Sequence, residues 1–578
     1  MASRQATSKS QLPALIISFV AFVVLGLIVF GQSIKGPFIW DDGEMVYDNQ
    51  FVRAGNGLLS IWSGKDVDYF PVTSAAFWIE WRMFGDNPAG YRVVNILLHA
   101  SSSFLIWRIL KRLKLPGAGM AAAIYCVHPV CVGTVAWVAE LKNTLSVFFA
   151  LLSTLVFLRA RPRENTSQPK WNWQLYVVSI IAFALALLSK ISVVMLPFVL
   201  LALINWRKRS EPLRVAPFFM LSLACGLLGV WFQQHRAMVS AQSTDIAPML
   251  SRILGGGYAL WFYCSKVLLP INLMPIYPHL AIDSRNLLAW MPLVLWLVLL
   301  SLLWMSRKKW TLGSVAFFCL MFFTVTAIPV LGIVPISFLL QTQVADHLQY
   351  FPMIGLVAVV GFAVHQAAVR FGPAAKRQGG SPFTVRAAAV CLVLVLSSLS
   401  FARARLFSDA EALWRDNIRK NPGAPMAWAN LADLLDGQGH YDQAIDAYRR
   451  SIELDPGNLT VRENLANTLN KTGRFDEALE QLRAVSLRQP NVAHLHNNIG
   501  ILLMAKGHFT EAVAEFQVAV KLAPANSQTH LNLGDCYARL GKLDDAIAEF
   551  EQVLRISPGD KVALTYLQHA RIEKENRR

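Results

Sequence analysis

Two adjacent carboxylates, Asp41 and Asp42, lie in the string FIWDDGEMVYDN, directly after an apolar run. That run, residues 12–31, is long enough to cross a bilayer. Acids at the end of a membrane helix can be solvated loop residues or the N-cap of a following helix. They can also supply a general base that removes the proton from an attacking hydroxyl group. The choice depends on the polar groups that accompany the pair.

Further ionisable groups stand at the ends of other apolar runs, where such groups are costly and suggest function. Taken alone, His128 favours a packed side chain with one hydrogen bond, and Glu140 can simply pair with Lys142. Lys190, in LLSKISVV, has no acidic neighbour in sequence, so it requires an anion from elsewhere in the fold or from a ligand. The remaining candidates are Arg92, Tyr277, His347 and Tyr350.

Together these groups favour one kind of reaction, the transfer of a group from a lipid-linked phosphate to a soluble nucleophile. A carboxylate would accept the proton of the nucleophile. The cations would stabilise the charge that develops on the leaving phosphate. Two adjacent acids also resemble the beginning of a metal site, but no third ligand with suitable spacing follows. We therefore expect no metal cofactor, with a divalent metal at Asp41 as the alternative.

The composition is that of a membrane protein. Of 578 residues, 54% are hydrophobic and 16% are charged, whereas soluble chains carry about a quarter charged residues. The net charge of +17 comes largely from short basic loops between apolar runs, such as KRLK (111–114) and RKR (207–209). Such loops mark the cytoplasmic side, so we expect no nucleic-acid partner. The seven cysteines show no zinc or redox spacing.

Keeping every basic cluster inside predicts a cytoplasmic segment 1–11, a membrane domain 12–402 with a first outer loop 32–91, and eleven spans. Residues 255–269 are then a re-entrant or interfacial segment. Asp41, Asp42 and the C-terminal domain lie outside. The expected spans are 12–31, 93–110, 117–136, 138–158, 173–189, 191–206, 215–232, 288–305, 312–329, 344–367 and 386–402.

The C-terminal part carries a repeat. Prolines recur every 34 residues, at Pro422, Pro456, Pro490, Pro524 and Pro558, with small and large apolar positions in register, which is the tetratricopeptide pattern. The predicted domain, 408–575, consists of a half repeat 408–424, repeats 425–458, 459–492, 493–526 and 527–560, and a capping helix 560–575. Stacked repeats form a concave surface that binds peptides or proteins. The candidate partner-binding residues are Trp428, Asn430, Asn464, Asn498 and Asn532.

Six strings occur in an order that resembles a known family. They are FIWDDGEMVYDN, YFPVTSAAFWIEWRMFGDNPAGYRVVNILLHA, AIYCVHPVCVGTVAWVAELKNTLS, LLSKISVVMLP, LLPINLMPIYP and VADHLQYFPMIG. From about Gly31 to the C-terminus the chain resembles the multi-span glycosyltransferases of the GT-C fold, in particular the transmembrane-and-tetratricopeptide O-mannosyltransferases and their bacterial relatives. The resemblance implies an all-α fold, a polytopic membrane helix bundle followed by an α-solenoid.

The resemblance also implies an activity, the inverting transfer of a mannose-like sugar from a polyprenyl- or dolichyl-phosphate carrier to a protein Ser/Thr hydroxyl. Asp41 and Asp42 fall on the position of the base; we favour Asp42 as the base, with Asp41 binding sugar, acceptor or metal. His128, Glu140, Lys142 and Lys190 match positions that line the donor pocket.

One departure concerns the donor: His347 and Gln349 stand where relatives show Arg and Leu. If that Arg binds the carrier phosphate, His347 would do so only when protonated.

Two other functions compete with this one. A membrane-anchored tetratricopeptide scaffold with an inactive transferase-like domain would bind partner proteins and no lipid carrier. An O-antigen ligase or polymerase would need an outer loop rich in Arg and His, and residues 233–254 hold few. The expected location is the bacterial inner membrane with a periplasmic repeat domain, or the endoplasmic reticulum membrane in a eukaryote.

Overall fold

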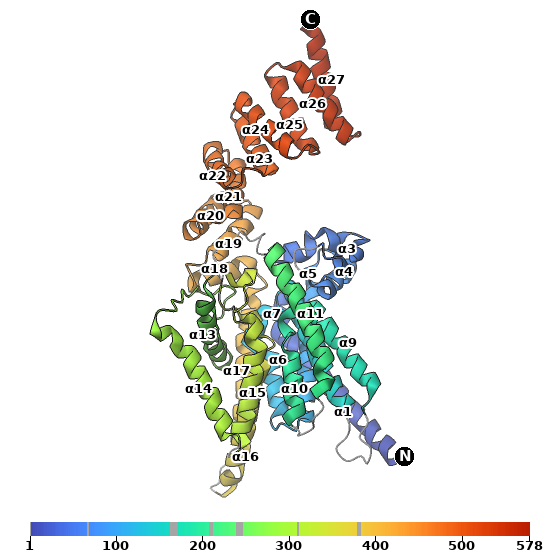
Figure 1. Cartoon of the computed structure of the whole chain (residues 1–578), viewed down its shortest axis with the longest axis vertical. Helices are drawn as coiled ribbons and strands as arrows, with labels where there is room; N and C mark the ends of the chain where they lie inside the picture. The colour runs from blue at the N-terminus through green and yellow to red at the C-terminus, as the bar shows by residue number, and fades with distance from the viewer. Residues whose placement is uncertain are drawn as a thin grey trace. The chain divides into compact units, whose positions relative to one another are not determined.

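The structure, a computed structural model, describes residues 2–65, 69–161, 171–206, 212–237, 247–308, 311–340, 342–377 and 383–577. Over these ranges the regular structure is helical throughout, without a strand. The chain folds into two compact units, Met1–Asn421 and Pro422–Arg578. Each unit is helical, as the sequence predicts (Figure 1).

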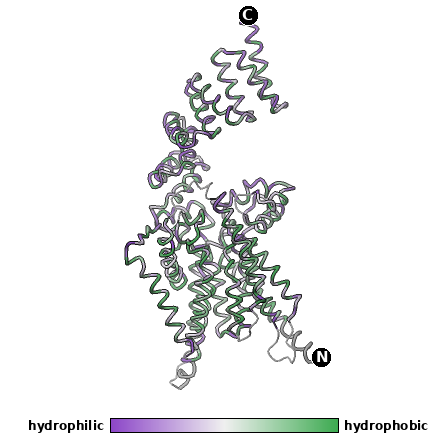
Figure 2. The backbone as a smooth tube through the Cα atoms, viewed as in Figure 1, coloured by the Kyte–Doolittle hydropathy of each residue, from purple (hydrophilic) through white to green (hydrophobic). Residues whose placement is uncertain are grey.

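The first unit is an integral membrane domain. Figure 2 shows hydrophobic residues along most of its long helices. In the described part of the chain, eight helices are long and apolar enough to span a membrane, or nine if one bent pair counts as a span. The eight are Leu12–Lys35, Pro88–Arg112, Val138–Ala160, Pro212–Arg236, Leu287–Ser306, Leu312–Val330, Met353–Arg370 and Ala387–Leu406.

The other three expected spans have shorter or broken counterparts, so the total of eleven stays a prediction. Residues 117–136 form a pair, Ala118–Val127 and Pro129–Val135, bent by 45°. Residues 173–206 form two short apolar helices, Trp173–Ser189 and Ile191–Ile204. The segment expected to be interfacial lies in α13 (Met249–Leu268), which is not among the eight spans and carries Arg252 and Lys266.

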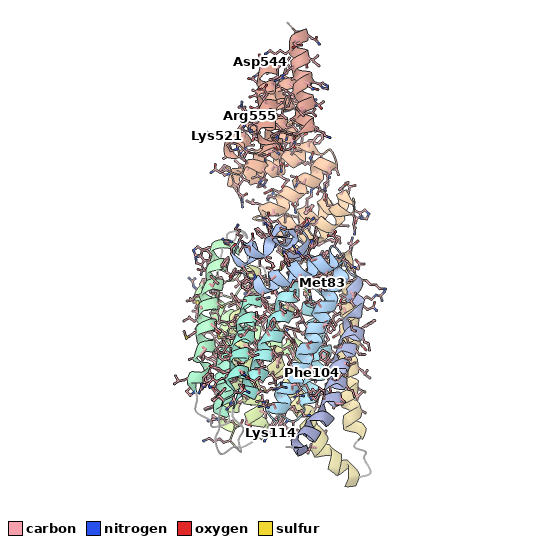
Figure 3. The ribbon with its side chains drawn as sticks, turned by 90° about the vertical axis from the view of Figure 1, so that its right-hand side faces the viewer. Met83, Phe104, Lys114, Lys521, Asp544 and Arg555 are labelled. Atoms are coloured by element: carbon pink, nitrogen blue, oxygen red, sulfur yellow. The ribbon has the colours of Figure 1, made fainter. Side chains whose placement is uncertain are left out.

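The helices that hold the candidate residues begin and end at recognisable signals. In α5 (Pro88–Arg112), Asn87 caps the N-terminus, its side chain accepting from the Ala89 N–H at 3.0 Å, and Lys111 and Arg112 end the helix. A proline at the first helical position and basic residues at the last turn suit these ends. Figure 3 shows Met83, just before α5, toward one end of this unit and Lys114, just after α5, at the other.

Breaks between helices set the remaining positions. Pro129 follows α6 (Ala118–Val127), and two short 3₁₀ turns, Pro129–Cys131 and Val138–Glu140, lead into α8 (Leu141–Ala160). The helix α9 (Trp173–Ser189) ends at Lys190, whose φ of −163° is extended. Irregular backbone of this kind is tolerated at membrane depth where protein buries it, and it places Glu140 and Lys190 at helix ends.

The second unit consists of helix pairs. The repeats correspond to α19 and α20 (Pro425–Gly437, Tyr441–Leu454), α21 and α22 (Leu459–Lys471, Phe475–Arg488), α23 and α24 (Ala493–Ala505, Phe509–Leu522), α25 and α26 (Ser527–Arg539, Leu543–Ile556), then α27 (Lys561–Asn576). The helix of the expected half repeat, α18 (Ala410–Lys420), lies in the first unit. There Asn417 Oδ1 accepts from the Ile276 N–H at 2.9 Å.

A glycine contact fixes α16 (Met353–Arg377), which follows the candidate residue His347, against α6. A Cβ at Gly361 would lie 2.7 Å from the Ala121 nitrogen and 2.9 Å from the Gly117 carbonyl oxygen. Two helix backbones therefore meet where only glycine fits, as small residues permit in membranes.

We expect Gly361→Ala to lower the stability of the protein in detergent by about 1–3 kcal/mol, because the added methyl group overpacks this crossing. Gly119→Ala in α6 is the matched control, since nothing lies within 4 Å of its Cβ position. The thermal midpoint in a scan of both purified variants measures the effect. Equal midpoints would contradict the close crossing.

Candidate active site

The first outer loop is held against the membrane helices by Arg92 of α5. Its Nε donates to the Ala136 carbonyl at 2.9 Å, and its two terminal nitrogens donate to the carbonyls of Gly36 and Pro37. The side chain is fully buried. Arg92 is a candidate for binding the lipid carrier, but each of its three nitrogens donates to a backbone oxygen. Its side chain therefore positions the loop.

Asp42 forms the second attachment of this loop. One carboxylate oxygen accepts from the Ile39 N–H at 2.8 Å and the other from the Ala139 N–H at 2.7 Å. Burial raises the pKa of Asp42 to about 7, against the two N–H groups and Arg92, which lower it. The side chain is inaccessible. Asp42 thus joins the outer loop to the turn before α8, and its buried carboxylate does not face solvent.

Asp41 points elsewhere. One third of its side chain is exposed, and its Oδ2 lies 3.7 Å from Lys142 Nζ. The preceding residue, Trp40, has a φ of +47°, a left-handed conformation that a bulky side chain rarely adopts. This turn lets two adjacent acids have different surroundings. Burial raises the pKa of Asp41 above its ordinary value, and the nearby Lys142 opposes that rise.

Glu140 lies between two lysines. Its Oε1 is 3.6 Å from Lys142 Nζ, and its Oε2 is 3.9 Å from Lys190 Nζ. Asn143 Nδ2 donates to Oε2 and, at 3.3 Å, to the His347 carbonyl. Asp41, Lys142, Glu140 and Lys190 thus alternate in charge; we call these four residues the acid–lysine network. The anion that Lys190 requires is Glu140, 50 residues earlier in the chain.

His347 lies beside this network as a neutral side chain. Its ring stands edge-on to Trp137 and to Phe338, with centroids 5.9 Å and 4.9 Å apart. Burial lowers the pKa of His347 to about 4, although Glu140 partly opposes this. The imidazole therefore carries no charge near neutral pH, where a phosphate ligand would require one.

Three further candidates are bonded within the protein. His128 Nδ1 accepts from the Val130 N–H at 3.2 Å, so its Nε2–H donates to the Val267 carbonyl at 3.0 Å. The Tyr350 hydroxyl lies 2.8 Å from His99 Nδ1. The Tyr277 hydroxyl donates to Asp346 Oδ1 at 2.9 Å. These contacts join segments far apart in the chain, and the structure does not bring the three into the acid–lysine network.

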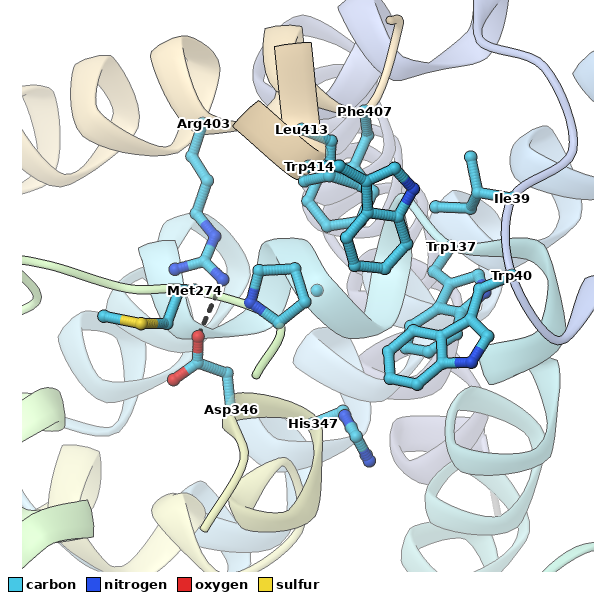
Figure 4. A pocket seen from close by; sticks show the side chains of 12 residues that line it. Ile39, Trp40, Trp137, Met274, Asp346, His347, Arg403, Phe407, Leu413 and Trp414 are labelled. Carbon is cyan, nitrogen blue, oxygen red and sulfur yellow. Dashed lines mark hydrogen bonds and ion pairs between the residues drawn. The ribbon is translucent and has the colours of Figure 1, made fainter. Parts of the chain in front are cut away.

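A mostly apolar pocket adjoins the network. Trp40 and Trp137 stack with centroids 5.1 Å apart, and Trp414 meets Trp40 edge-on at 5.5 Å. Figure 4 shows these indoles on one side of the pocket and Arg403, paired with Asp346, on the other. Sequence reasoning missed Arg403 and the tryptophans. The available signal was Arg403 itself, a basic residue at the outer end of the last expected span, where topology does not require one.

Two of the five partner-binding candidates of the second unit link consecutive repeats. Asn464 Nδ2 donates to Asp433 Oδ1 at 2.9 Å, and Asn532 Nδ2 donates to Asn497 Oδ1 at 3.2 Å. Asn430 donates to its own helix at the Met426 carbonyl, Asn498 accepts from Asn497, and Trp428 Nε1 donates to Pro422. All five are half-buried, so part of each stays accessible on the repeat surface.

The acids do not converge on a metal position. Asp42 is committed to two N–H groups, and among the described residues no three His, Cys, Asp or Glu side chains come together. The loop at 233–254 that a ligase would use lies partly, at 238–246, outside the described residues.

The first unit is thus a polytopic helical membrane domain with a charged network at a span end, and the second consists of tetratricopeptide helix pairs. Comparison with known families agrees. Residues 68–231 match the family described as dolichyl-phosphate-mannose-protein mannosyltransferase, and residues 397–458, 437–499 and 497–561 match tetratricopeptide repeats. The first match includes Glu140, Lys142 and Lys190 and begins after Asp41.

Over part of its length the chain is similar to protein O-mannosyl-transferases. It is 30% identical over 202 residues to human TMTC4 (30% of this chain, 27% of the relative) and 28% identical over 162 residues to mouse TMTC2 (26% and 19%). A Caenorhabditis elegans protein O-mannosyl-transferase, F38B6.6, is 26% identical over 160 residues (25% and 23%). The matched segments therefore span about a quarter or less of these relatives' length.

Solved tetratricopeptide proteins also match. YrrB is 20% identical, with 30% of this chain and 86% of YrrB covered and a TM-score of 0.26. MamA of Desulfovibrio magneticus is 21% identical, with 27% and 88% covered and the same TM-score.

The two adjacent acids should differ in their effect on stability. In Asp42→Asn an amide group replaces one carboxylate oxygen and faces an N–H donor, which costs about 1–3 kcal/mol. Asp41→Asn leaves those bonds intact and should keep the wild-type thermal midpoint. Differential scanning fluorimetry of both purified variants checks this. A lower midpoint for Asp41→Asn than for Asp42→Asn would refute the assigned roles.

Proposed function

We propose that the protein transfers a mannose-like sugar from a polyprenyl-phosphate carrier to a Ser or Thr hydroxyl of an acceptor protein, with inversion at the sugar carbon. The carrying observation is Asp41, a partly exposed carboxylate linked through Lys142 to the buried Glu140–Lys190 pair. Homology to protein O-mannosyl-transferases supports the reaction class.

In the proposed step the acceptor hydroxyl oxygen attacks C1 of the sugar from the face opposite the phosphate. The C1–O bond to the phosphate breaks, and the polyprenyl phosphate leaves with the electron pair. Asp41 takes the hydroxyl proton as general base and later releases it to solvent. A single displacement inverts C1. We assign the base to Asp41 rather than Asp42 because both Asp42 oxygens accept backbone N–H groups.

Glu140 has a positioning role in this scheme. It is buried between Lys142 and Lys190 and holds both ammonium groups at the edge of the site. An ammonium held in a site that excludes water stabilises the developing phosphate charge without reorganising at the moment of reaction. The network itself is neutral, because it holds two acids and two lysines. The lysines would therefore act on the phosphate through their positions and not through an excess of positive charge.

The repeat unit would hold the acceptor or a partner protein, since half-buried asparagines on consecutive repeats suit backbone recognition of an extended segment. We place the reaction at the outer face of a bacterial inner membrane, or at the lumenal face of the endoplasmic reticulum in a eukaryote. The basic loops on the opposite side support this orientation.

Asp41→Asn should reduce sugar transfer by about 10²–10⁴-fold, the range for loss of a general base, with the carrier still bound. Asp48→Asn is the matched control, because Asp48 is an exposed acid seven residues later in the same loop and should retain full activity. The assay follows a radiolabelled polyprenyl-phosphate mannose into acceptor protein. Unchanged transfer by Asp41→Asn would falsify the assignment and favour the scaffold function.

Carrier binding should not depend on His347 protonation. With a pKa of about 4, the imidazole is neutral across pH 5.5–8, so affinity for polyprenyl phosphate should show no titration near pH 6.5 from this group. His347→Gln should then bind within about twofold of wild type, and Lys190→Ala should bind several-fold more weakly. Thermal-shift titrations at four pH values measure both. A loss of binding above pH 6.5 that His347→Gln abolishes would contradict this.

A further inference from the structure

Arg403, near the end of the last membrane-spanning helix of the first unit, α17 (Phe383–Leu406), is incompletely bonded. Its NH2 group donates to Asp346 Oδ2 at 2.7 Å, but Nε and NH1 are buried without a hydrogen-bond partner. The side chain is only 9% exposed. Leaving a buried charged donor unsatisfied is costly, and native structures rarely do so without a functional reason.

A second unsatisfied donor belongs to the same pocket. The indole Nε1 of Trp137 is buried and has no partner, and Trp137 and Arg403 both line the cavity. The only carboxylate in the lining, Asp346, already accepts from Tyr277 and Arg403, one bond on each oxygen. The pocket therefore presents donors that no protein acceptor reaches, so it suits a ligand that brings acceptor oxygens.

The local charge favours an anion. Asp346 neutralises Arg403, and Lys266 acts electrostatically on both from the neighbouring α13. Lys266 Nζ lies 5.4 Å from the centre of the Tyr277 ring, and Tyr277 bonds Asp346. Two cations and one carboxylate leave a net charge of about +1. The unbonded N–H groups of the guanidinium can donate to the oxygens of a phosphate.

The pocket also adjoins the proposed base. Trp40, the residue before Asp41, forms one wall by stacking on Trp137. His347, which cannot supply a charge near neutral pH, lines the same cavity. The remaining lining is mostly apolar, with Met274, Pro275 and Phe407 among it, as a phosphate on an isoprenoid chain requires of its surroundings.

We propose that this tryptophan-lined pocket binds the phosphate of the lipid carrier, with Arg403 and the Trp137 indole N–H as its donors. The assignment rests on the proposed sugar transfer and identifies the group that takes the leaving phosphate in place of His347.

The test is equilibrium binding of citronellyl phosphate, a short isoprenoid phosphate, to the full-length protein in detergent, measured by thermal shift and isothermal titration. Citronellol and inorganic phosphate are the comparison ligands. Arg403→Gln should weaken citronellyl phosphate at least tenfold. Arg405→Gln, which changes an exposed arginine in the same last turn, should bind within about twofold of wild type.

Trp137→Phe keeps an aromatic ring at this position but removes the N–H together with the pyrrole part of the indole, so it tests the site if Arg403→Gln fails to fold. It should weaken citronellyl phosphate by about threefold to tenfold and leave citronellol unchanged. Wild-type affinity in both folded variants would overturn the proposal. Inorganic phosphate binding as tightly as citronellyl phosphate would also overturn it, since the site would then take a soluble anion.

Because binding of citronellyl phosphate is measured without sugar transfer, the phosphate site and the proposed reaction can be tested separately. Asp41→Asn should lose transfer and keep citronellyl phosphate affinity. Carrier binding that depends on Arg403 in a wild-type protein without sugar transfer would uphold the phosphate site and refute the proposed reaction. Sugar transfer that survives Arg403→Gln at wild-type KM would refute the phosphate site alone.

Discussion

The site depends on how one loop is attached to the membrane helices. Arg92 in α5 donates hydrogen bonds to the backbone of that loop, and Asp42 in the loop accepts a hydrogen bond from the turn before α8. Both side chains are buried, so breaking either bond set would leave an uncompensated charge, which is strongly destabilising. The bond between Asp42 and the Ala139 N–H joins the two segments. Asp41 is next to Asp42 and Lys142 follows Ala139 closely, so this bond also brings Asp41 and Lys142 together.

The attachment explains why the acids behave differently although they are neighbours. Asp42 faces inward to two N–H groups, whereas Asp41 faces a lysine and solvent. The acid–lysine network joins three segments, the outer loop, the start of α8 and the end of α9, each of which ends or begins at a break in helix. The charged groups of the network thus lie at or next to breaks between helices, where side chains from several segments meet.

Some of this could be predicted from the sequence. Eight of the expected spans, the 34-residue repeat and the ionisable residues Glu140, Lys142 and Lys190 follow from local pattern and from the cost of charge near lipid. The roles of Arg92 and His128 could not be predicted, because their partners, Gly36 and Val267, are 56 and 139 residues away. Arg403 was overlooked although its position at the outer end of the last expected span was a signal, because its unsatisfied nitrogens are visible only in the structure.

The left-handed backbone at Trp40 has a consequence for how this site can change. A residue held at positive φ against its preference stores about 1–3 kcal/mol of strain. Glycine at that position would relieve the strain and would remove an indole from the wall of the pocket at the same time. Selection for a more stable fold therefore favours glycine at residue 40, whereas selection for the pocket favours tryptophan. A variant with glycine there could gain stability and lose one wall of the pocket in the same step.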